Sequence, residues 1–119
     1  MITKANDLPA EQRERMRGGE GTVSISHAAP AGALPAGLRL HAQLTLPPGA
    51  GIGEHVHEHE TELFYVLRGQ GEMLQDGVWM PLAPGDATST GDGQSHALRN
   101  TGDGPFVVMA TIVKDGATG

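Results

Sequence analysis

Two histidines separated by a single residue, His55 and His57, are the side chains best placed to do chemistry. Alternate side chains of a β-strand share a face, so both imidazoles point the same way with Cβ atoms roughly 6–7 Å apart. At that separation two imidazoles can bind one metal ion, each at about 2.0–2.1 Å. Glu62 opens the next apolar run and offers a carboxylate oxygen. Two imidazoles, one carboxylate and open positions predict an iron, manganese, nickel or zinc site rather than a closed structural one.

A fourth candidate ligand, His96, follows a Gly-rich turn and opens a later strand. The competing interpretation is a solvated loop, because Glu54–Glu62 is rich in His and Glu and such tracts also bind metals adventitiously. His59, Glu58 and Glu60 fit that interpretation, and we expect them at the rim or in solvent. The spacing of His55, His57, Glu62 and His96 favours a built metal site for those four residues.

The clearest period-2 pattern in the chain is Leu38–Leu46. Leu38, Leu40, Ala42, Leu44 and Leu46 lie on one face, and the other face carries Arg39, His41, Gln43 and Thr45. One interpretation is that the polar face is solvated, as in an exposed antiparallel sheet. The other is that Arg39, His41 and Gln43 line the interior of a small barrel, where ligands often bind.

Later strands place apolar side chains beside the candidate ligands. Phe64 and Val66 share a face with Glu62, and Leu98 shares one with His96, so these three residues are expected to wall the site. An Asp76-Gly77 pair predicts a tight hairpin turn. Short strands separated by turn signals predict an all-β barrel or double-sheet jelly roll. The expected strands span residues 22–27, 38–46, 72–74, 78–82, 86–90 and 106–113.

The N-terminal segment differs from the rest in lacking a clear strand pattern. Asp7 can cap a short helix with Pro9 in its first turn and Glu11 to Met16 as its body, ended by Gly18-Gly19. The length of 119 residues predicts one domain. We expect an N-terminal arm and first strand over residues 1–36, a barrel over 37–114 and a loose tail over 115–119.

Composition excludes several classes of function. The net charge of −6 argues against a nucleic-acid surface, because phosphate binding needs clustered Lys and Arg. No apolar run approaches the 18 residues of a spanning helix, so no membrane partner is expected. The chain has no cysteine, which excludes disulfides and thiol catalysis. The default expectation is a cytoplasmic protein.

The spacing of these residues resembles the two motifs of the cupin family. The first motif, G-x5-H-x-H-x4-E-x6-G, is matched by Gly49, His55, His57, Glu62 and Gly69. The second, G-x5-P-x-G-x2-H-x3-N, is matched by Gly85, Gly93, His96 and Asn100, with Gly91 in place of the usual proline. The resemblance implies a conical jelly-roll barrel with one divalent transition metal inside. It also implies the metal ligands, which are His55, His57, Glu62 and His96.

The chain looks most similar to small manganese cupins grouped with oxalate decarboxylase, so manganese is the first expectation, with iron, nickel or zinc as alternatives. True oxalate decarboxylases carry an Arg three residues before the first metal histidine, where this chain has Ile52. Arg39 is then the nearest substitute cation. The resemblance also implies a homodimer that pairs through its outer sheet.

Two functions stay open from the sequence. The first is a metal-dependent enzyme acting on a small oxygenated metabolite such as a dicarboxylate or keto acid, with His41 or Arg39 as the catalytic candidates. The second is a non-catalytic module that binds or senses a small molecule in the same barrel. For either function the expected substrate-binding residues are Arg39, His41, Gln43, Phe64, Val66 and Leu98.

Overall fold

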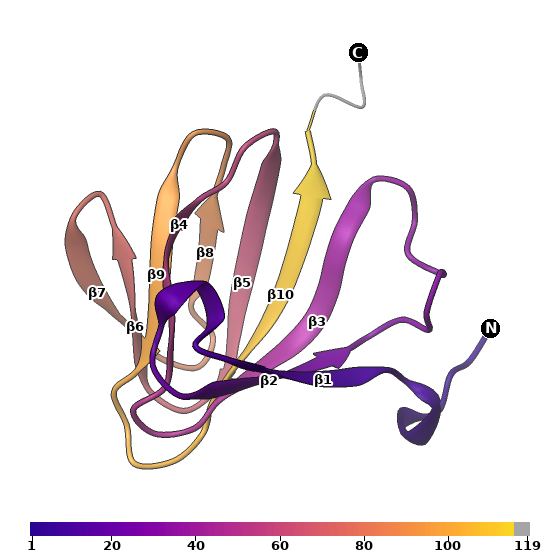
Figure 1. Ribbon diagram of the computed structural model, residues 1–119, viewed down its shortest axis with the longest axis horizontal. Coiled ribbons are helices and arrows are strands. Elements are labelled where there is room, and N and C mark those ends of the chain that lie inside the picture. Colours follow the sequence, from indigo (N-terminus) through magenta and orange to yellow (C-terminus); the bar gives the residue numbers. More distant parts are fainter. Residues whose placement is uncertain (116–119) are drawn as a thin grey trace.

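The structure, a computed structural model, describes residues 1–115 and is built almost entirely of β-strands (Figure 1). Of the expected tail, residues 116–119 lie outside the described part, and the Asp115 amide donates a hydrogen bond to the carbonyl of His59. In chain order, with two 3₁₀ turns labelled η, the elements are η1 (Ala5–Asp7), β1 (Ala10–Glu14), η2 (Met16–Gly18), β2 (Thr22–His27), β3 (Leu38–Leu46), β4 (Gly51–Val56), β5 (Glu60–Arg68), β6 (Gly71–Gln75), β7 (Val78–Leu82), β8 (Ala87–Thr90), β9 (Ser95–Asn100) and β10 (Phe106–Lys114).

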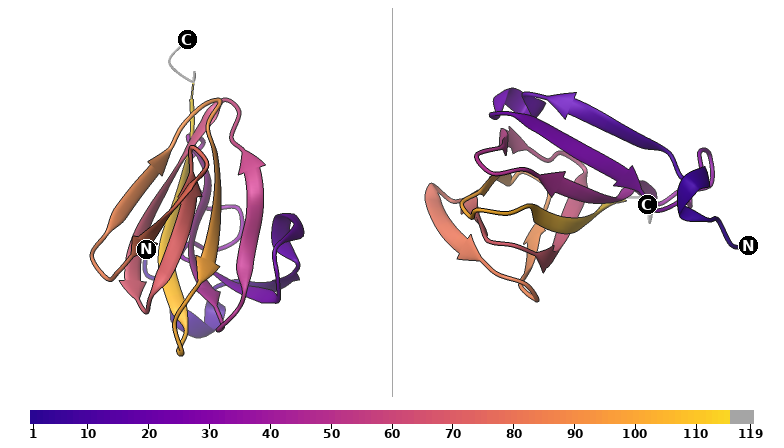
Figure 2. Two further views of the ribbon diagram at one scale, coloured as in Figure 1. Left: turned by 90° about the vertical axis from the view of Figure 1, so that its left-hand side faces the viewer. Right: turned by 90° about the horizontal axis from the view of Figure 1, so that it is seen from below.

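The strands form two antiparallel sheets that face each other across one interior (Figure 2). The larger sheet has the order β1-β2-β3-β10-β5-β8, and the smaller one β4-β9-β6-β7. The chain crosses repeatedly from one sheet to the other, so neighbours within a sheet are mostly distant in sequence. This arrangement confirms the predicted all-β jelly-roll barrel.

The alternation of β3 decides which of its faces is buried. Ala42, Leu44 and Leu46 are buried against the core, together with side chains from β5 and β10. The opposite face therefore points out of the barrel, and the His41 ring pairs there with the Thr111 hydroxyl of the neighbouring strand β10. The interior-facing interpretation is wrong for His41 and Gln43, because burying the leucine face leaves the polar face outside.

The N-terminal arm is a strand instead of the expected helix. Residues 10–14 pair with β2 in unbroken antiparallel register, from Ala10 opposite Ser26 to Glu14 opposite Thr22. A helix of this length is marginal in water, whereas the edge of β2 offers a full ladder of backbone partners. The helix prediction over Glu11–Met16 is therefore wrong, and the only helical turns in residues 1–115 are η1 and η2.

Two turn residues singled out in the sequence behave as predicted. The Asp76-Gly77 hairpin has φ values of 53° and 76°, the positive pair that a type I′ turn requires. At the end of β9, the Asn100 amide donates to the carbonyls of Leu46 and Gly104, each at 2.8 Å. These bonds fix β9, which carries His96 at its other end, against the end of β3.

Candidate metal centre

The four predicted ligands converge between the two sheets. His55 in β4 lies directly opposite His96 in β9 in the smaller sheet, and His57 follows the end of β4. Glu62 comes from β5 of the larger sheet. One nitrogen or oxygen from each residue lies within 4.8 Å of the others, and His57, Glu62 and His96 are buried. The sequence spacing therefore predicted a cluster that the fold assembles.

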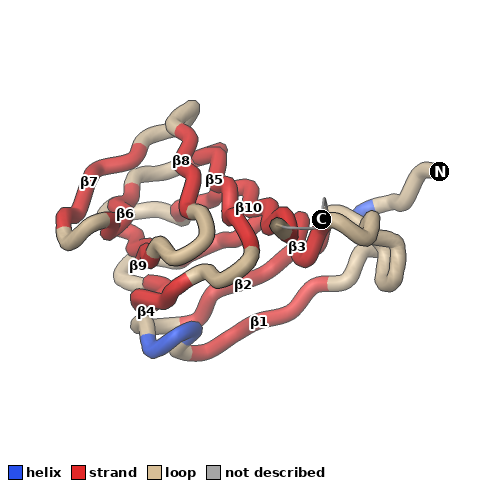
Figure 3. Tube along the Cα trace, turned by 90° about the horizontal axis from the view of Figure 1, so that it is seen from above, coloured by secondary structure: helices blue, strands red, loops and turns tan. Residues whose placement is uncertain are grey.

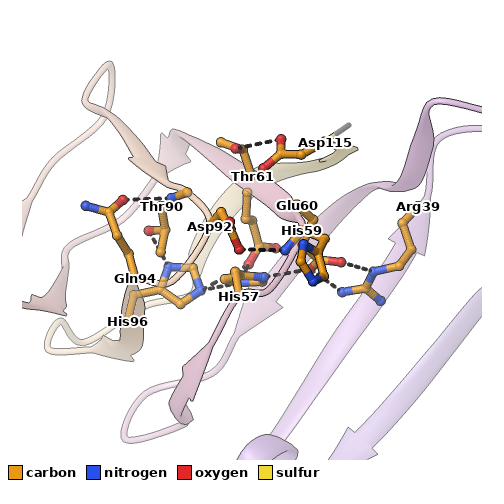
Figure 4. A network of polar contacts seen from close by, with 12 residues as sticks. Arg39, His57, His59, Glu60, Thr61, Thr90, Asp92, Gln94, His96 and Asp115 are labelled. Carbon is orange, nitrogen blue, oxygen red and sulfur yellow. Dashed lines mark hydrogen bonds and ion pairs between the residues drawn. The ribbon is translucent and has the colours of Figure 1, made fainter. Parts of the chain in front are cut away.

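Each histidine of the cluster is held through its Nδ1 atom. His55 Nδ1 donates to the carbonyl oxygen of Gly53 at 2.8 Å, and His57 Nδ1 donates to the Glu60 carboxylate at 2.6 Å. His96 Nδ1 pairs with the buried Thr90 hydroxyl at 2.8 Å (Figure 4). Partners on Nδ1 leave each Nε2 available to a metal and fix the orientation of each ring, as is usual around metal-binding histidines.

The distances between ligand atoms match those around a common metal ion. Glu62 Oε1 lies 3.0 Å from His57 Nε2 and 3.1 Å from His96 Nε2, and the two Nε2 atoms are 3.0 Å apart. Ligands bound at about 2.1 Å and at right angles to one another are about 3.0 Å apart, against about 3.4 Å at tetrahedral angles. These three atoms lie close enough together to bind one ion, and their separations are also those of the hydrogen bonds that join them.

Electrostatics keeps Glu62 ionised despite its burial. Burial alone would raise the pKa of the Glu62 carboxyl, but hydrogen bonds with His57 and His96 outweigh it and hold the pKa at about 2. The hydrogen bond with Glu62 raises the pKa of His57 against the effect of burial. Burial lowers the pKa of His55, and the charge of Arg17 adds to that shift. The centre is a carboxylate that attracts positive charge, which a proton or a metal ion can supply.

A cavity of about 170 Å³ opens onto the cluster. Phe64 and Leu98 line it, as the sequence predicts, and the Phe64 ring stacks on His96 with ring centres 5.2 Å apart. Arg39, the second residue of β3, also lines the cavity. Val66 is instead buried in the core away from the cavity, and His41 and Gln43 lie outside. The volume is below the 300–1,000 Å³ typical of drug-sized sites, so the cavity suits a ligand of a few heavy atoms.

Sequence reasoning missed Glu60, which it assigned to solvent. The Glu60 side chain is only 14% exposed and links His57 to Arg39, which donates from Nε and Nη2 at 2.8 Å each (Figure 4). The alternation of β5 could have predicted this position, because Glu60 shares the inward face of the strand with Glu62 and Phe64. Glu60 thus orients a candidate ligand, and Arg39 holds Glu60.

Sequence reasoning also missed the contribution of the arm. Arg13, Met16, Arg17 and His27 line the cavity. No local pattern marks these residues, because they reach the site only through the pairing of β1 with β2 and the docking of η2 on β4.

A largely buried cluster of three histidines and a glutamate inside a two-sheet jelly roll is typical of one family of β-barrels. The Cupin_2 family model, described as the cupin domain, matches residues 42–112, and the chain belongs to the cupin family. No helix among residues 1–115 is long and apolar enough to cross a membrane.

Known proteins are similar to this chain in sequence as well as in fold. The chain is 35% identical over 113 residues to an oxalate-binding protein of Thermotoga maritima, covering 95% of this chain and 93% of that protein. The crystal structure of a "predicted oxalate decarboxylase" from Thermotoga maritima matches with a TM-score of 0.89 and 35% identity, over 96% of this chain and 99% of that one. A shorter match to quercetin 2,3-dioxygenase of Bacillus subtilis is 42% identical over 53 residues, covering 44% of this chain and 16% of that enzyme.

Proposed function

We propose that His55, His57, Glu62 and His96 bind one divalent transition metal ion. The observation that carries the proposal is the set of three histidines held at Nδ1, whose other nitrogens converge with the Glu62 carboxylate. Three imidazoles and one carboxylate with open positions suit manganese, iron, nickel or zinc, and manganese comes first because the chain resembles small manganese cupins.

The proposed ligand of this metal is a small dicarboxylate such as oxalate. Four protein ligands leave open positions on an octahedral ion, where a Lewis-acidic metal binds two oxygens of one ligand. The small cavity, its arginines and the 35% identical oxalate-binding relative support this class of ligand. The apolar wall of Phe64 and Leu98 excludes water from one side of the ligand and strengthens its electrostatic contacts.

Turnover of the same ligand is the second candidate function, in a decarboxylase, oxygenase or isomerase. It requires a titratable group beside the ligand that is not itself bound to the metal. His27 lines the cavity and is the observation that favours this function, with its Nε2 paired to Glu11 at 2.8 Å. His41 cannot serve, because its ring lies outside the barrel, and Arg39 cannot, because a guanidinium stays protonated.

Calorimetric titration tests the proposed function directly. Oxalate is titrated into the protein stripped of metal and into the protein loaded with manganese. We expect binding only to the loaded protein, and product analysis of the loaded mixture then separates binding from turnover. Equal oxalate binding with and without metal would contradict a metal-dependent site.

A further inference from the structure

The N-terminal arm is docked on the strand that carries His55. After β1, the short η2 turn lies against β4 (Figure 3). Met16 of this turn packs against the hydrophobic core. The contact is backbone to backbone. A Cβ atom on Gly19 would overlap the Gly51 carbonyl, and one on Gly53 would overlap the carbonyl of Arg17. Glycine at these positions is what allows the arm to lie so close to the centre.

This docking places one arginine at the cavity. Arg17 lines it, whereas Arg15, two residues earlier in the same turn, does not. Both have left-handed backbone conformations, with φ values of 54° and 49°, which are unfavourable for side chains other than glycine. Non-glycine residues are held in such conformations mainly at sites where the surrounding structure requires them.

Arg17 is also the cavity arginine whose charge is available to a ligand. Arg13 pairs with Glu11 at 2.9 Å and Arg39 pairs with Glu60 at 2.8 Å. Within residues 1–115, Arg17 makes no ion pair with a carboxylate. A divalent metal ion and Arg17 would together bring three positive charges against the one negative charge of Glu62. A dianion would neutralise the remaining two.

We propose that Arg17 binds the carboxylate of the metal-bound ligand that faces the cavity mouth, so that the N-terminal arm selects dianions over monoanions. This inference rests on the proposed metal-dependent binding of a dicarboxylate and adds the residue that recognises its second charge. Arg17 is a planar donor whose N–H groups suit a carboxylate.

The test compares Arg17→Gln with Arg15→Gln, a matched control in the same turn and the same backbone region. Manganese is titrated into each protein first, and oxalate or the monoanion glycolate is then titrated into the loaded forms. We expect Arg17→Gln to keep the manganese affinity and to lose roughly tenfold to a hundredfold in oxalate affinity, as for a hydrogen bond to a charged group. Arg15→Gln should stay within twofold of the wild type for both.

A second variant addresses the arm instead of the charge. Gly19→Ala should push η2 off β4 and weaken oxalate binding, and its manganese affinity is measured alongside because Gly19 packs on Gly53, whose carbonyl holds His55 Nδ1. An oxalate affinity of Arg17→Gln within twofold of the wild type would overturn the proposal, as would equal losses for oxalate and glycolate. Failure of the wild type to bind manganese would instead refute the proposed function, and the inference with it.

Discussion

At the scale of single residues, the candidate ligands are oriented by hydrogen bonds from residues behind them. Glu60 accepts from His57 Nδ1 at 2.6 Å and so fixes which nitrogen of that ring faces the centre. Carboxylate partners of metal-binding histidines also make the ring a stronger ligand. Glu60 therefore belongs to the candidate metal site through its bond to His57, although it is not one of the four proposed ligands.

We predict that Glu60→Gln weakens metal affinity by roughly tenfold to a hundredfold, because an amide is a weaker acceptor for the His57 N–H. Competition with a coloured chelator measures the change. Glu58→Gln is the control, since Glu58 is exposed two residues earlier, and its affinity should match the wild type. Equal affinities for all three proteins would show that the His57 bond has no part in metal binding.

The four candidate ligands were predictable because strand alternation and motif spacing are local properties of the sequence. Glu60 was missed because its neighbours, Glu58 and His59, suggested a solvated tract, and the alternation of β5 was not extended back to it. Arg17 could not be found from local patterns, since its position depends on the docking of η2 against a strand more than thirty residues away.

At the scale of elements, the sequence correctly predicted the strands that have an apolar face. The alternation of β3 and the turn at Asp76-Gly77 predicted real strands and a real hairpin. The N-terminal helix was wrong because β1 has five exposed residues and no apolar stripe, so its structure is set by pairing with β2. The polar face of β3 was left open by the sequence, and the burial of its leucines decided it.

Close packing between β6 and β10 gives an element-scale prediction. A Cβ atom on Gly71 would meet the ring of fully buried Phe106, which has little room to move. We predict that Gly71→Ala lowers the free energy of unfolding by about 1–3 kcal/mol, the usual cost of overpacking a core. Urea denaturation of the variant and the wild type measures this difference in the free energy of unfolding.

The matched control for this prediction is Gly37→Ala. Gly37 has open space around its Cβ position and no positive φ. Its substitution should be neutral or slightly stabilising, because alanine reduces the entropy of the unfolded chain. A Gly71→Ala variant as stable as the Gly37→Ala variant would contradict the packing described for β6 and β10.

At the scale of the whole molecule, the candidate centre joins the two sheets. Its ligands come from β4 and β9 on one side and from β5 on the other. A bound ion would therefore stabilise the barrel as a unit. We predict that metal at 100 times its Kd raises the free energy of unfolding by about 2.7 kcal/mol and Tm by several degrees, and that a chelator reverses both. Calorimetry on stripped and loaded protein tests this, and an unchanged Tm would contradict it.

The outer face of the larger sheet gives a prediction of assembly. Leu63, Tyr65 and Leu67 of β5 are each more than 40% exposed and lie in a row. Exposed apolar rows of this kind mark contacts between proteins, so we propose that two copies pair through this face. Size-exclusion chromatography with light scattering should give twice the chain mass of 12.4 kDa.

A charge in this row should separate the copies. Tyr65→Lys is expected to give a monomer, whereas Met80→Lys, at an exposed apolar position on β7 of the other sheet, should leave the dimer intact. A wild-type protein that elutes as a clean monomer would contradict pairing through β5.

The central claim, one metal ion held by His55, His57, Glu62 and His96, is tested most directly by metal content. Untagged wild type and His96→Ala are expressed in manganese- and iron-supplemented media and analysed by mass spectrometry, with circular dichroism to confirm the fold. We predict close to one manganese or iron per wild-type chain and loss of most metal in His96→Ala, because one of four ligands is gone. Wild-type protein that takes up no metal even after re-addition, or a His96→Ala variant with full occupancy, would contradict the account.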